Sequence, residues 1–486
     1  MYILLELYIL FSILFFFFFS ISYCYSLKLK LPNLDSNLFA LSFIIFLNSL
    51  YLCLNNTFTD LSLFNNLLLK DGSTNVICLF IITINLFVIV LTRYYNKTLF
   101  IPSFEFQLLI LFITFNSLFL ISVNNLFLFF LLLEVLSISL FILSAINRRS
   151  RYSIESSLKY FVLGSFSSIL MLLGISLVYI STSLMFLDDL SILFTSLNYS
   201  VLFSTGINLA LIFISIGFFF KLYSAPFHFW VSDIYQGSAT SSVFLFATSS
   251  SFIFFYLFIK LFFTTFYPFF SFFNYYFIIF SLLSMFFGCI GGLIQNRIKK
   301  ILAYSSITSI GYLILVLFSC STTSIESAFL FIISYIITLI GIFTILCSIL
   351  LKNKSFLNFS VQLTNISTSN RLMSFSLASF LFSMGGIPPF FGFIAKFELI
   401  GSLLTSKLFY LFFIFLLIST ISFLYYLRIL KWIYTKNHNT SVLFEEFNYT
   451  TSLVISFILL GITLSSIFNS SLFLFSKLIS ICLLTS

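Results

Sequence analysis

The sequence predicts an all-α, polytopic membrane protein with about fourteen transmembrane helices. Of its 486 residues, 60% are hydrophobic and only 8% are charged, which leaves too few polar side chains to cover a soluble globule. Apolar windows of about 20 residues recur along the whole chain, and each is long enough to cross the hydrocarbon core of a bilayer. Only helices satisfy their backbone groups within one such segment, so each window is expected to be helical.

The expected helices follow one another through short polar connections, such as Asn124 and Asn125. The first apolar run has no basic leading segment and carries Glu6, so we expect a retained helix rather than a cleaved signal. The fourteen helices are centred near Phe15, Phe46, Leu86, Phe112, Leu133, Ile169, Ile216, Phe252, Leu283, Leu313, Ile337, Phe382, Leu417 and Leu460.

Basic residues concentrate in alternate connections. Connections after even-numbered helices offer little beyond Lys70 and Lys407. By the positive-inside rule the odd connections face the cytoplasm or mitochondrial matrix, and both termini face the other side. We attribute the net charge of +9 to these topology signals near lipid headgroups and expect no nucleic-acid partner. The basic residues after odd helices are Lys28, Lys30, Arg93, Lys97, Arg148, Arg149, Arg151, Arg297, Lys299, Lys300, Lys352, Lys354, Arg371, Lys431 and Lys436.

The cysteines and histidines do not indicate a metal or redox centre. The seven cysteines are scattered through apolar segments without a close pair at a metal-ligand spacing. Small buried side chains are therefore favoured over a disulfide framework or a cluster. With His228 and His438 as the only histidines, haem or zinc ligation is not expected either.

Two lysines, Lys221 and Lys396, lie beside residues that interrupt long apolar runs. A cation in hydrocarbon is costly and usually faces a polar cavity or a partner, and interrupted helices in two halves of a chain mark transport sites. The pattern predicts a membrane ion pathway, with water or polar groups satisfying the carbonyls freed at the second break and Lys396 within one water of them. The breaking residues are Pro226 in the first run and Gly385, Gly386, Pro388 and Pro389 in the second.

Glu134 lies in the middle of an expected helix, with no cation within one turn. One interpretation is a protonated acid that hydrogen-bonds a neighbouring helix. The interpretation we favour is a carboxylate that faces Lys221 directly or through one water, because an intramembrane acid marks a functional site by default. Such a pair could exchange a proton when its separation changes.

The other ionisable residues have simpler explanations. Glu155 and Lys159 are spaced for a local ion pair, which is at least as good an interpretation as a role of Lys159 in proton entry. Lys260 is expected to extend toward the headgroups. Asp188 and Asp189 are expected in a solvated loop.

The residues around the breaks carry a family resemblance over positions 124–431. The chain resembles the antiporter-like membrane subunits of respiratory complex I, and Tyr235-Gln236-Gly237 favours the subunit 2 branch, the bacterial subunit N. The matching segments are residues 153–161, 220–237, 247–248, 296–307, 311–313, 386–388, 392–397 and 425–428.

The resemblance implies two inverted five-helix repeats, helices four to eight and nine to thirteen, with discontinuous helices seven and twelve. It divides the chain into residues 1–105 (helices one to three), 106–265 (first repeat), 266–436 (second repeat) and 437–486 (helix fourteen). By position, Glu134 is the family's helix-five glutamate, Lys221 its helix-seven lysine and Lys396 its helix-twelve lysine. These three residues are expected to transfer protons.

The resemblance also implies an activity and a setting. The subunit would translocate protons and hold no redox cofactor, while NADH, FMN, iron-sulfur clusters and ubiquinone would act in partner subunits. Its expected neighbours are subunits 4L and 4 and the membrane lipids. The 75 phenylalanines suggest A+T-biased organellar coding, so we expect the mitochondrial inner membrane, with both termini on the intermembrane-space side.

Two positions depart from the family pattern. Ser251 stands where many relatives have a helix-eight lysine, and Ser309 stands where they commonly have a histidine. Lys260 cannot replace the lysine, because nine residues along a helix place it roughly 13 Å away on the opposite face. A path of water held by hydroxyl groups is expected instead, since hydroxyls relay protons without storing them. The candidates are Ser251, Ser305, Ser306, Ser309 and Tyr312.

Two alternatives stay open at this point. The chain could be a subunit of a cation/proton antiporter, which the same lysines and breaks would suit. It could also be a structural membrane-arm subunit that has lost pumping, for which Ser251 and Ser309 are the motivation.

Overall fold

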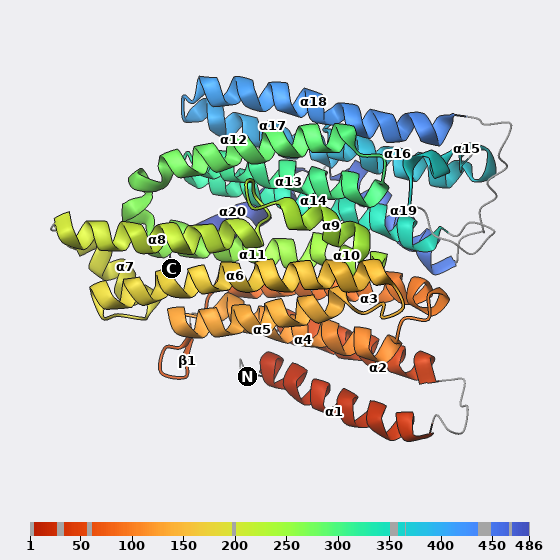
Figure 1. Cartoon of the computed structure of the whole chain (residues 1–486), viewed down its shortest axis with the longest axis horizontal. Helices are drawn as coiled ribbons and strands as arrows, with labels where there is room; N and C mark the ends of the chain where they lie inside the picture. Colours follow the sequence, from red (N-terminus) through yellow and green to blue (C-terminus); the bar gives the residue numbers. More distant parts are fainter. Residues whose placement is uncertain are drawn as a thin grey trace. The chain divides into compact units, whose positions relative to one another are not determined.

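The computed structural model is almost entirely helical, and the predicted all-α class is confirmed (Figure 1). It describes residues 4–26, 34–55, 61–196, 201–349, 358–364, 366–435, 449–465 and 469–485. Several residues used above lie outside these ranges or have side chains that are not described: Lys28, Lys30, Lys352, Lys354, Lys436, His438, Cys24 and Cys482.

Contacts divide the chain into two units, which are considered separately. The first contains Met1–Lys221, Ser249–Phe272 and Cys482–Ser486, and the second contains Leu222–Thr248 and Phe273–Ile481. The boundary crosses a π-helical segment, η2 (Phe246–Ser250), that continues α10 directly into α11.

In the first unit, α6 packs along α8 (Figure 1). Small residues allow this close approach, as is common between membrane helices. A Cβ atom on Gly174 of α6 would lie 2.7 Å from the carbonyl oxygen of Ala210 on α8. The elements of this unit are α1 (Leu4–Ser26), α2 (Leu34–Leu54), β1 (Leu61–Leu63), β2 (Leu68–Lys70), α3 (Gly72–Thr98), α4 (Ser103–Ser122), α5 (Leu126–Ser144), α6 (Arg151–Thr182), α7 (Leu187–Ser196), α8 (Val201–Lys221), α11 (Ser251–Ile259), η3 (Lys260–Thr265) and η4 (Tyr267–Phe269).

In the second unit, α14 is a central helix that contacts α16, α17 and α19, while α13 contacts α9, α14 and α18. The elements are α9 (Phe229–Gly237), α10 (Thr240–Leu245), α12 (Phe270–Ile294, whose first residues belong to the first unit), α13 (Ile298–Leu317), α14 (Thr322–Ser348), η5 (Ser360–Leu363), α15 (Ile366–Ser369), α16 (Arg371–Gly385), α17 (Phe391–Thr405), α18 (Phe409–Tyr434), α19 (Tyr449–Leu464) and α20 (Asn469–Thr485).

Ten helices in the described part of the chain are long and apolar enough to cross a membrane, and three shorter apolar helices accompany them. Every predicted centre lies inside a helix, although the total of fourteen spans stays a prediction. Three features were not predicted. The hairpin β1–β2 precedes α3, the short helix α7 follows α6, and the expected C-terminal helix is described as α19 and α20.

Candidate functional site

The predicted break in the second apolar run separates α16, which ends at Gly385, from α17, which begins at Phe391. Gly386 ends α16 in the left-handed conformation (φ +80°), which glycine adopts without strain. Pro388 and Pro389 follow, and neither can donate a backbone hydrogen bond. The local sequence therefore both stops α16 and leaves carbonyl groups without helical partners.

Lys396 satisfies one of these carbonyls. Its Nζ donates to the oxygen of Gly385 at 2.9 Å, although the side chain is on the next helix and the residue is only 9% exposed. A polar side chain thus lies at the break, as the freed carbonyls require. The contact stabilises the charged ammonium by a charge-assisted hydrogen bond.

Gly392 holds the two half-helices together. A Cβ atom at this position would lie 1.8 Å from the backbone oxygen of Ser383 on α16, so a larger residue could not fit without separating the helices. The Gly392 N–H also points to Ser383 and donates to its Oγ at 3.3 Å. This crossing fixes Lys396, one turn farther along α17, beside the end of α16.

A polar cavity lies next to Lys396. Its volume is about 20 Å³, measured as the space open to the centre of a water molecule, and one water needs roughly 10–15 Å³ by this measure. The cavity therefore has room for water. Its lining from α13, α14, α16, α17 and α18 consists of Ser305, Thr308, Ser309, Tyr312, Phe331, Ser334, Tyr335, Thr338, Ser383, Met384, Gly392, Lys396, Ser422, Tyr425 and Tyr426.

Hydroxyl groups meet in pairs across this cavity. Tyr312 Oη and Ser422 Oγ lie 3.3 Å apart, and Ser305 Oγ and Tyr335 Oη lie 3.3 Å apart. Since a hydroxyl is both donor and acceptor, each pair can extend a water chain in either direction. Three of the predicted hydroxyl candidates therefore line one cavity with Lys396: Ser305, Ser309 and Tyr312. Ser306 is buried but does not line the cavity.

In the first unit, Lys221 is the last residue of α8 and is 7% exposed. Its Nζ lies 5.9 Å from the centre of the Phe254 ring, and Glu134 of α5 is near enough to act on it electrostatically. Glu134 Oε1 and Lys221 Nζ are both buried, and neither has a hydrogen-bond partner within the described residues. The two groups are therefore not in direct contact, and contact through one water stays a prediction.

The remaining predicted residues are placed as follows. Pro226 precedes α9 in the second unit. Ser251 is the first residue of α11 and is buried at 4% exposure. It belongs to the first unit, whereas the cavity with Lys396 belongs to the second. A hydrated path that joins Ser251 to that cavity stays a prediction.

Lys159 forms the local ion pair, with its Nζ 2.8 Å from Glu155 Oε1 and both side chains well exposed. The expectation for Lys260 was wrong, because its Nζ donates to the carbonyl oxygens of Ile121 and Val123 at 2.7 and 2.9 Å instead of extending to the headgroups. The end of α4 leaves carbonyls without helical partners, and a lysine satisfies them.

Asp188 and Asp189 were expected in a loop but lie in the first turn of α7, where acidic residues favour a helix start. Asp188 Oδ2 accepts a hydrogen bond of 2.9 Å from Asn124 Nδ2. Partial burial raises the pKa of Asp188 above its ordinary value.

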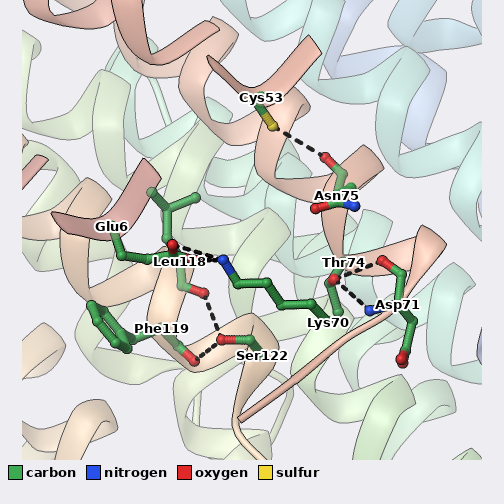
Figure 2. Close-up of polar contacts among 9 residues, drawn as sticks. All are labelled: Glu6, Cys53, Lys70, Asp71, Thr74, Asn75, Leu118, Phe119 and Ser122. Carbon is green, nitrogen blue, oxygen red and sulfur yellow. Dashed lines mark hydrogen bonds and ion pairs between the residues drawn. The ribbon is translucent and has the colours of Figure 1, made fainter. Parts of the chain in front are cut away.

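A buried ion pair was missed in the sequence. Lys70 Nζ lies 2.5 Å from Glu6 Oε1 and 2.7 Å from Glu6 Oε2, and the side chains are 6% and 7% exposed. Figure 2 shows the Lys70 side chain reaching from the strand β2 to the Glu6 carboxylate of α1, with Ser122 of α4 nearby. The two residues are 64 positions apart, so no local pattern could pair them. The sequence signal for this pair was one charged residue in each of two segments that have few other charges.

Within the described residues, no group of three or more histidine, cysteine, aspartate and glutamate side chains could hold a metal ion. The five cysteines with described side chains, Cys53, Cys78, Cys289, Cys320 and Cys347, are free thiols.

Comparisons with known proteins show which family the chain is similar to. The family model described as NADH:quinone oxidoreductase/Mrp antiporter matches residues 123–424. NADH-ubiquinone oxidoreductase chain 2 of Marchantia polymorpha is 32% identical over 423 residues, which are 86% of this chain and 85% of that protein. NADH-quinone oxidoreductase subunit N of Pelagibacter ubique is 33% identical over 376 residues, 77% of this chain and 78% of that protein.

The fold is also found in a solved structure. A chain of respiratory complex I from Thermus thermophilus, with bound Aureothin, superposes with a TM-score of 0.77 over 95% of this chain and 98% of that chain. Its sequence is 22% identical, so this likeness concerns the fold.

Proposed function

Because the chain belongs to the NADH:quinone oxidoreductase/Mrp antiporter family of membrane subunits, in its chain 2 or subunit N branch, we propose that it translocates protons in the membrane arm of NADH:ubiquinone oxidoreductase. The observation that carries the proposal is the pair of buried lysines at helix interruptions, Lys221 and Lys396, each with a different polar environment. Buried cations in membrane segments mark ion and proton paths.

Glu134 and Lys221 form the switch in this proposal. The Glu134 carboxylate acts on the Lys221 ammonium without a direct hydrogen bond, so a small change in their separation changes how firmly Lys221 holds its proton. Each shift of one pKa unit corresponds to about 1.4 kcal/mol, and the interaction rises steeply at short distance in a low dielectric. Movement of either helix would then load or release one proton.

Lys396 forms the second proton carrier. Its protonated form donates to the Gly385 carbonyl, and its neutral form would need a donor, which water in the adjoining cavity can provide. The hydroxyl pairs around Tyr312 and Ser305 can pass protons through that water. The path from the first unit to this cavity, through Ser251, is part of the proposal.

The proposal includes the setting of the subunit. This chain would carry no redox cofactor, while NADH, FMN, iron-sulfur clusters and ubiquinone would act in other subunits and drive the protons. Its neighbours would be subunits 4L and 4, in the mitochondrial inner membrane, with both termini on the intermembrane-space side. The names of the similar proteins support membership of this complex. The basic residues of the alternate connections support the proposed orientation of the termini.

The test compares proton pumping with NADH oxidation in assembled enzyme reconstituted into vesicles. Lys221→Ala and Glu134→Gln are expected to reduce pumping by at least about tenfold, and turnover should fall with it where the two are tightly coupled. Lys431→Ala is the matched control, since Lys431 is an exposed lysine in the last turn of α18. Normal pumping by fully assembled Lys221→Ala enzyme would rule the mechanism out.

Two alternatives have their own signatures. A cation/proton antiporter subunit would not co-purify with flavin and iron-sulfur subunits. A structural subunit, which Ser251 and Ser309 in place of the family's lysine and histidine would favour, would leave the number of protons pumped per NADH unchanged in all of the variants above.

A further inference from the structure

An apolar groove of about 490 Å³ lies in the first unit, between α1, α4, α5 and the start of α6. These helices are labelled in Figure 1. Its walls are almost wholly apolar and include Phe17 of α1, Leu108 of α4 and Ile142 of α5. The groove does not overlap the residues of the proposed proton path. It therefore needs an explanation of its own.

An apolar space of this size does not hold ordered water, because water in a cavity needs several polar partners. Its volume is within the range of about 300–1,000 Å³ that is typical of ligand sites. Phe17 and Ile142 are 43% and 53% exposed, so the groove opens to the surface of the transmembrane helices. In a bilayer this surface meets lipid, and a hydrocarbon chain is the occupant that such walls accept.

The charged residues of the groove, Arg148 and Glu105, lie beside the start of α6. Arg148 is paired with Glu105, at 2.7 Å. Arg149 and Arg151 do not line the groove but follow Arg148 closely in the chain. Both are exposed, and neither forms an ion pair within the residues that the structure describes. Two positive charges near the start of α6 are therefore not neutralised by ion pairs within the described residues.

The start of α6 adds to this positive charge. This helix has 32 residues and begins at Arg151, and Ser150 caps it by accepting from the Ser153 N–H. The first N–H groups of a helix attract anions through their unsatisfied donors and the helix dipole. Tyr152, which is 68% exposed, suits the headgroup level of a bilayer, where aromatic residues concentrate. The positive charge at the start of α6 and the expected position of Tyr152 at the headgroup level both fit a phosphate group at the membrane surface.

We propose that this groove binds an anionic phospholipid, with one acyl chain between α1, α4 and α5 and the phosphate held by Arg149, Arg151 and the start of α6. The basic connection lies on the side that the charge pattern assigns to the cytoplasm or matrix, where basic pockets between helices bind anionic headgroups. A helix of another subunit is the competing occupant. The arginines without an ion pair favour the lipid, because anionic headgroups are present at that level of the bilayer.

The test uses the assembled, purified enzyme in nanodiscs and two photoactivatable lipids with the same diazirine-bearing acyl chain, phosphatidylglycerol and phosphatidylcholine. We expect phosphatidylglycerol to label the segments around Leu108 and Ile142 at least about fivefold more than phosphatidylcholine, measured by peptide mass spectrometry. Each arginine near an anionic lipid contributes about fivefold in affinity. Arg149→Gln should therefore lower labelling about fivefold, and the double variant with Arg151→Gln about 25-fold.

The matched control is Arg371→Gln, because Arg371 is also an exposed arginine in an odd connection but belongs to the second unit, whereas the groove belongs to the first. It should leave labelling unchanged. Ile142→Trp, which places a larger side chain on the groove wall, should lower labelling by both lipids. If the arginine variants do not assemble, the test uses the unchanged enzyme alone. Unlabelled phosphatidylglycerol should then reduce the photolabelling more than unlabelled phosphatidylcholine does.

Equal labelling by the two lipids, or labelling that does not depend on Arg149 and Arg151, would refute the proposal. Absence of labelling around Leu108 and Ile142 by either lipid would also refute it, because the groove would then be filled by another occupant, such as a helix of another subunit. The readout is labelling and not pumping, so it is independent of the proposed proton path.

Discussion

The buried pair of Glu6 and Lys70 provides a quantitative test of the first unit. With an N–O distance of 2.7 Å and an effective dielectric of about 20, the attraction between the charges is roughly 6 kcal/mol. Removing both charges from water opposes this by several kcal/mol per ion, so the net benefit of the pair is small. Its loss has a different consequence, because the partner that remains is a buried and uncompensated charge.

Lys70→Met leaves the Glu6 side chain, which is 7% exposed, without its cation. Breaking a buried ion pair in this way lowers the free energy of unfolding by about 3–5 kcal/mol. The double variant Glu6→Met/Lys70→Met removes both charges and replaces them with side chains of similar volume, which is often neutral or stabilising. We therefore expect a large loss of stability in the single variant and recovery of most of that stability in the double variant.

The measurement is the temperature at which the assembled enzyme dissociates, together with its abundance on native gels. Glu155→Gln is the control, since the pair of Glu155 and Lys159 is exposed and such pairs contribute about 1 kcal/mol or less. A Lys70→Met enzyme as stable as the control would refute the reasoning. So would a double variant as unstable as the single one, because the cost would then not come from the unpaired carboxylate.

Two further predictions concern the second unit. Gly392→Ala places a Cβ atom 1.8 Å from the Ser383 backbone oxygen and should strongly reduce assembled enzyme on native gels, whereas Gly401→Ala on the same helix has open space and should not. Ser309→Ala removes a hydroxyl from the cavity beside Lys396 and should slow proton pumping by about fivefold, the equivalent of one hydrogen bond. Ser306 is next to Ser305 in the chain but does not line the cavity, so the Ser306→Ala enzyme should pump normally. Equal effects of the two serine variants on pumping would contradict the assignment of the cavity to the proton path.

The parts of the fold that the sequence predicted are those that local chemistry controls. Helix positions followed from apolar runs, and the break between α16 and α17 followed from Gly386, Pro388 and Pro389, which act on their own backbone. The hairpin β1–β2 was missed because each strand has only three residues. A segment that short gives no detectable alternation of apolar and polar residues.

The cavity could be predicted on one helix but not on the others. Ser305, Ser309 and Tyr312 are spaced four and three residues apart, so they share one face of α13. Ser306 directly follows Ser305 and therefore points to a different side of the helix. The partners Tyr335, Ser422, Tyr425 and Tyr426 come from α14 and α18. Lipid and neighbouring helices are equally apolar, so hydropathy does not reveal which face of those helices turns inward.

Long-range pairing explains the remaining errors. Lys260 was assigned to the headgroups from its position in its own helix, but its partners are carbonyls more than 130 residues earlier in the chain. Glu6 and Lys70 were each considered in their own segments for the same reason. A charged side chain in a membrane finds the nearest unsatisfied polar group, and tertiary structure alone determines where that group lies.

The two lysines of the proposed proton path differ in their surroundings, and this difference predicts the order of events in the proposed mechanism. Lys396 is held by a carbonyl that the helix break fixes in place, so we expect its surroundings to change little during the proposed proton transfer. Lys221 has no hydrogen-bond partner within the described residues and interacts with Glu134 at a distance, so its charge responds to any movement of α5 or α8. We therefore expect that a conformational change driven by electron transfer acts first on Glu134 and Lys221, and that Lys396 and its hydroxyl groups respond to the proton that this pair releases.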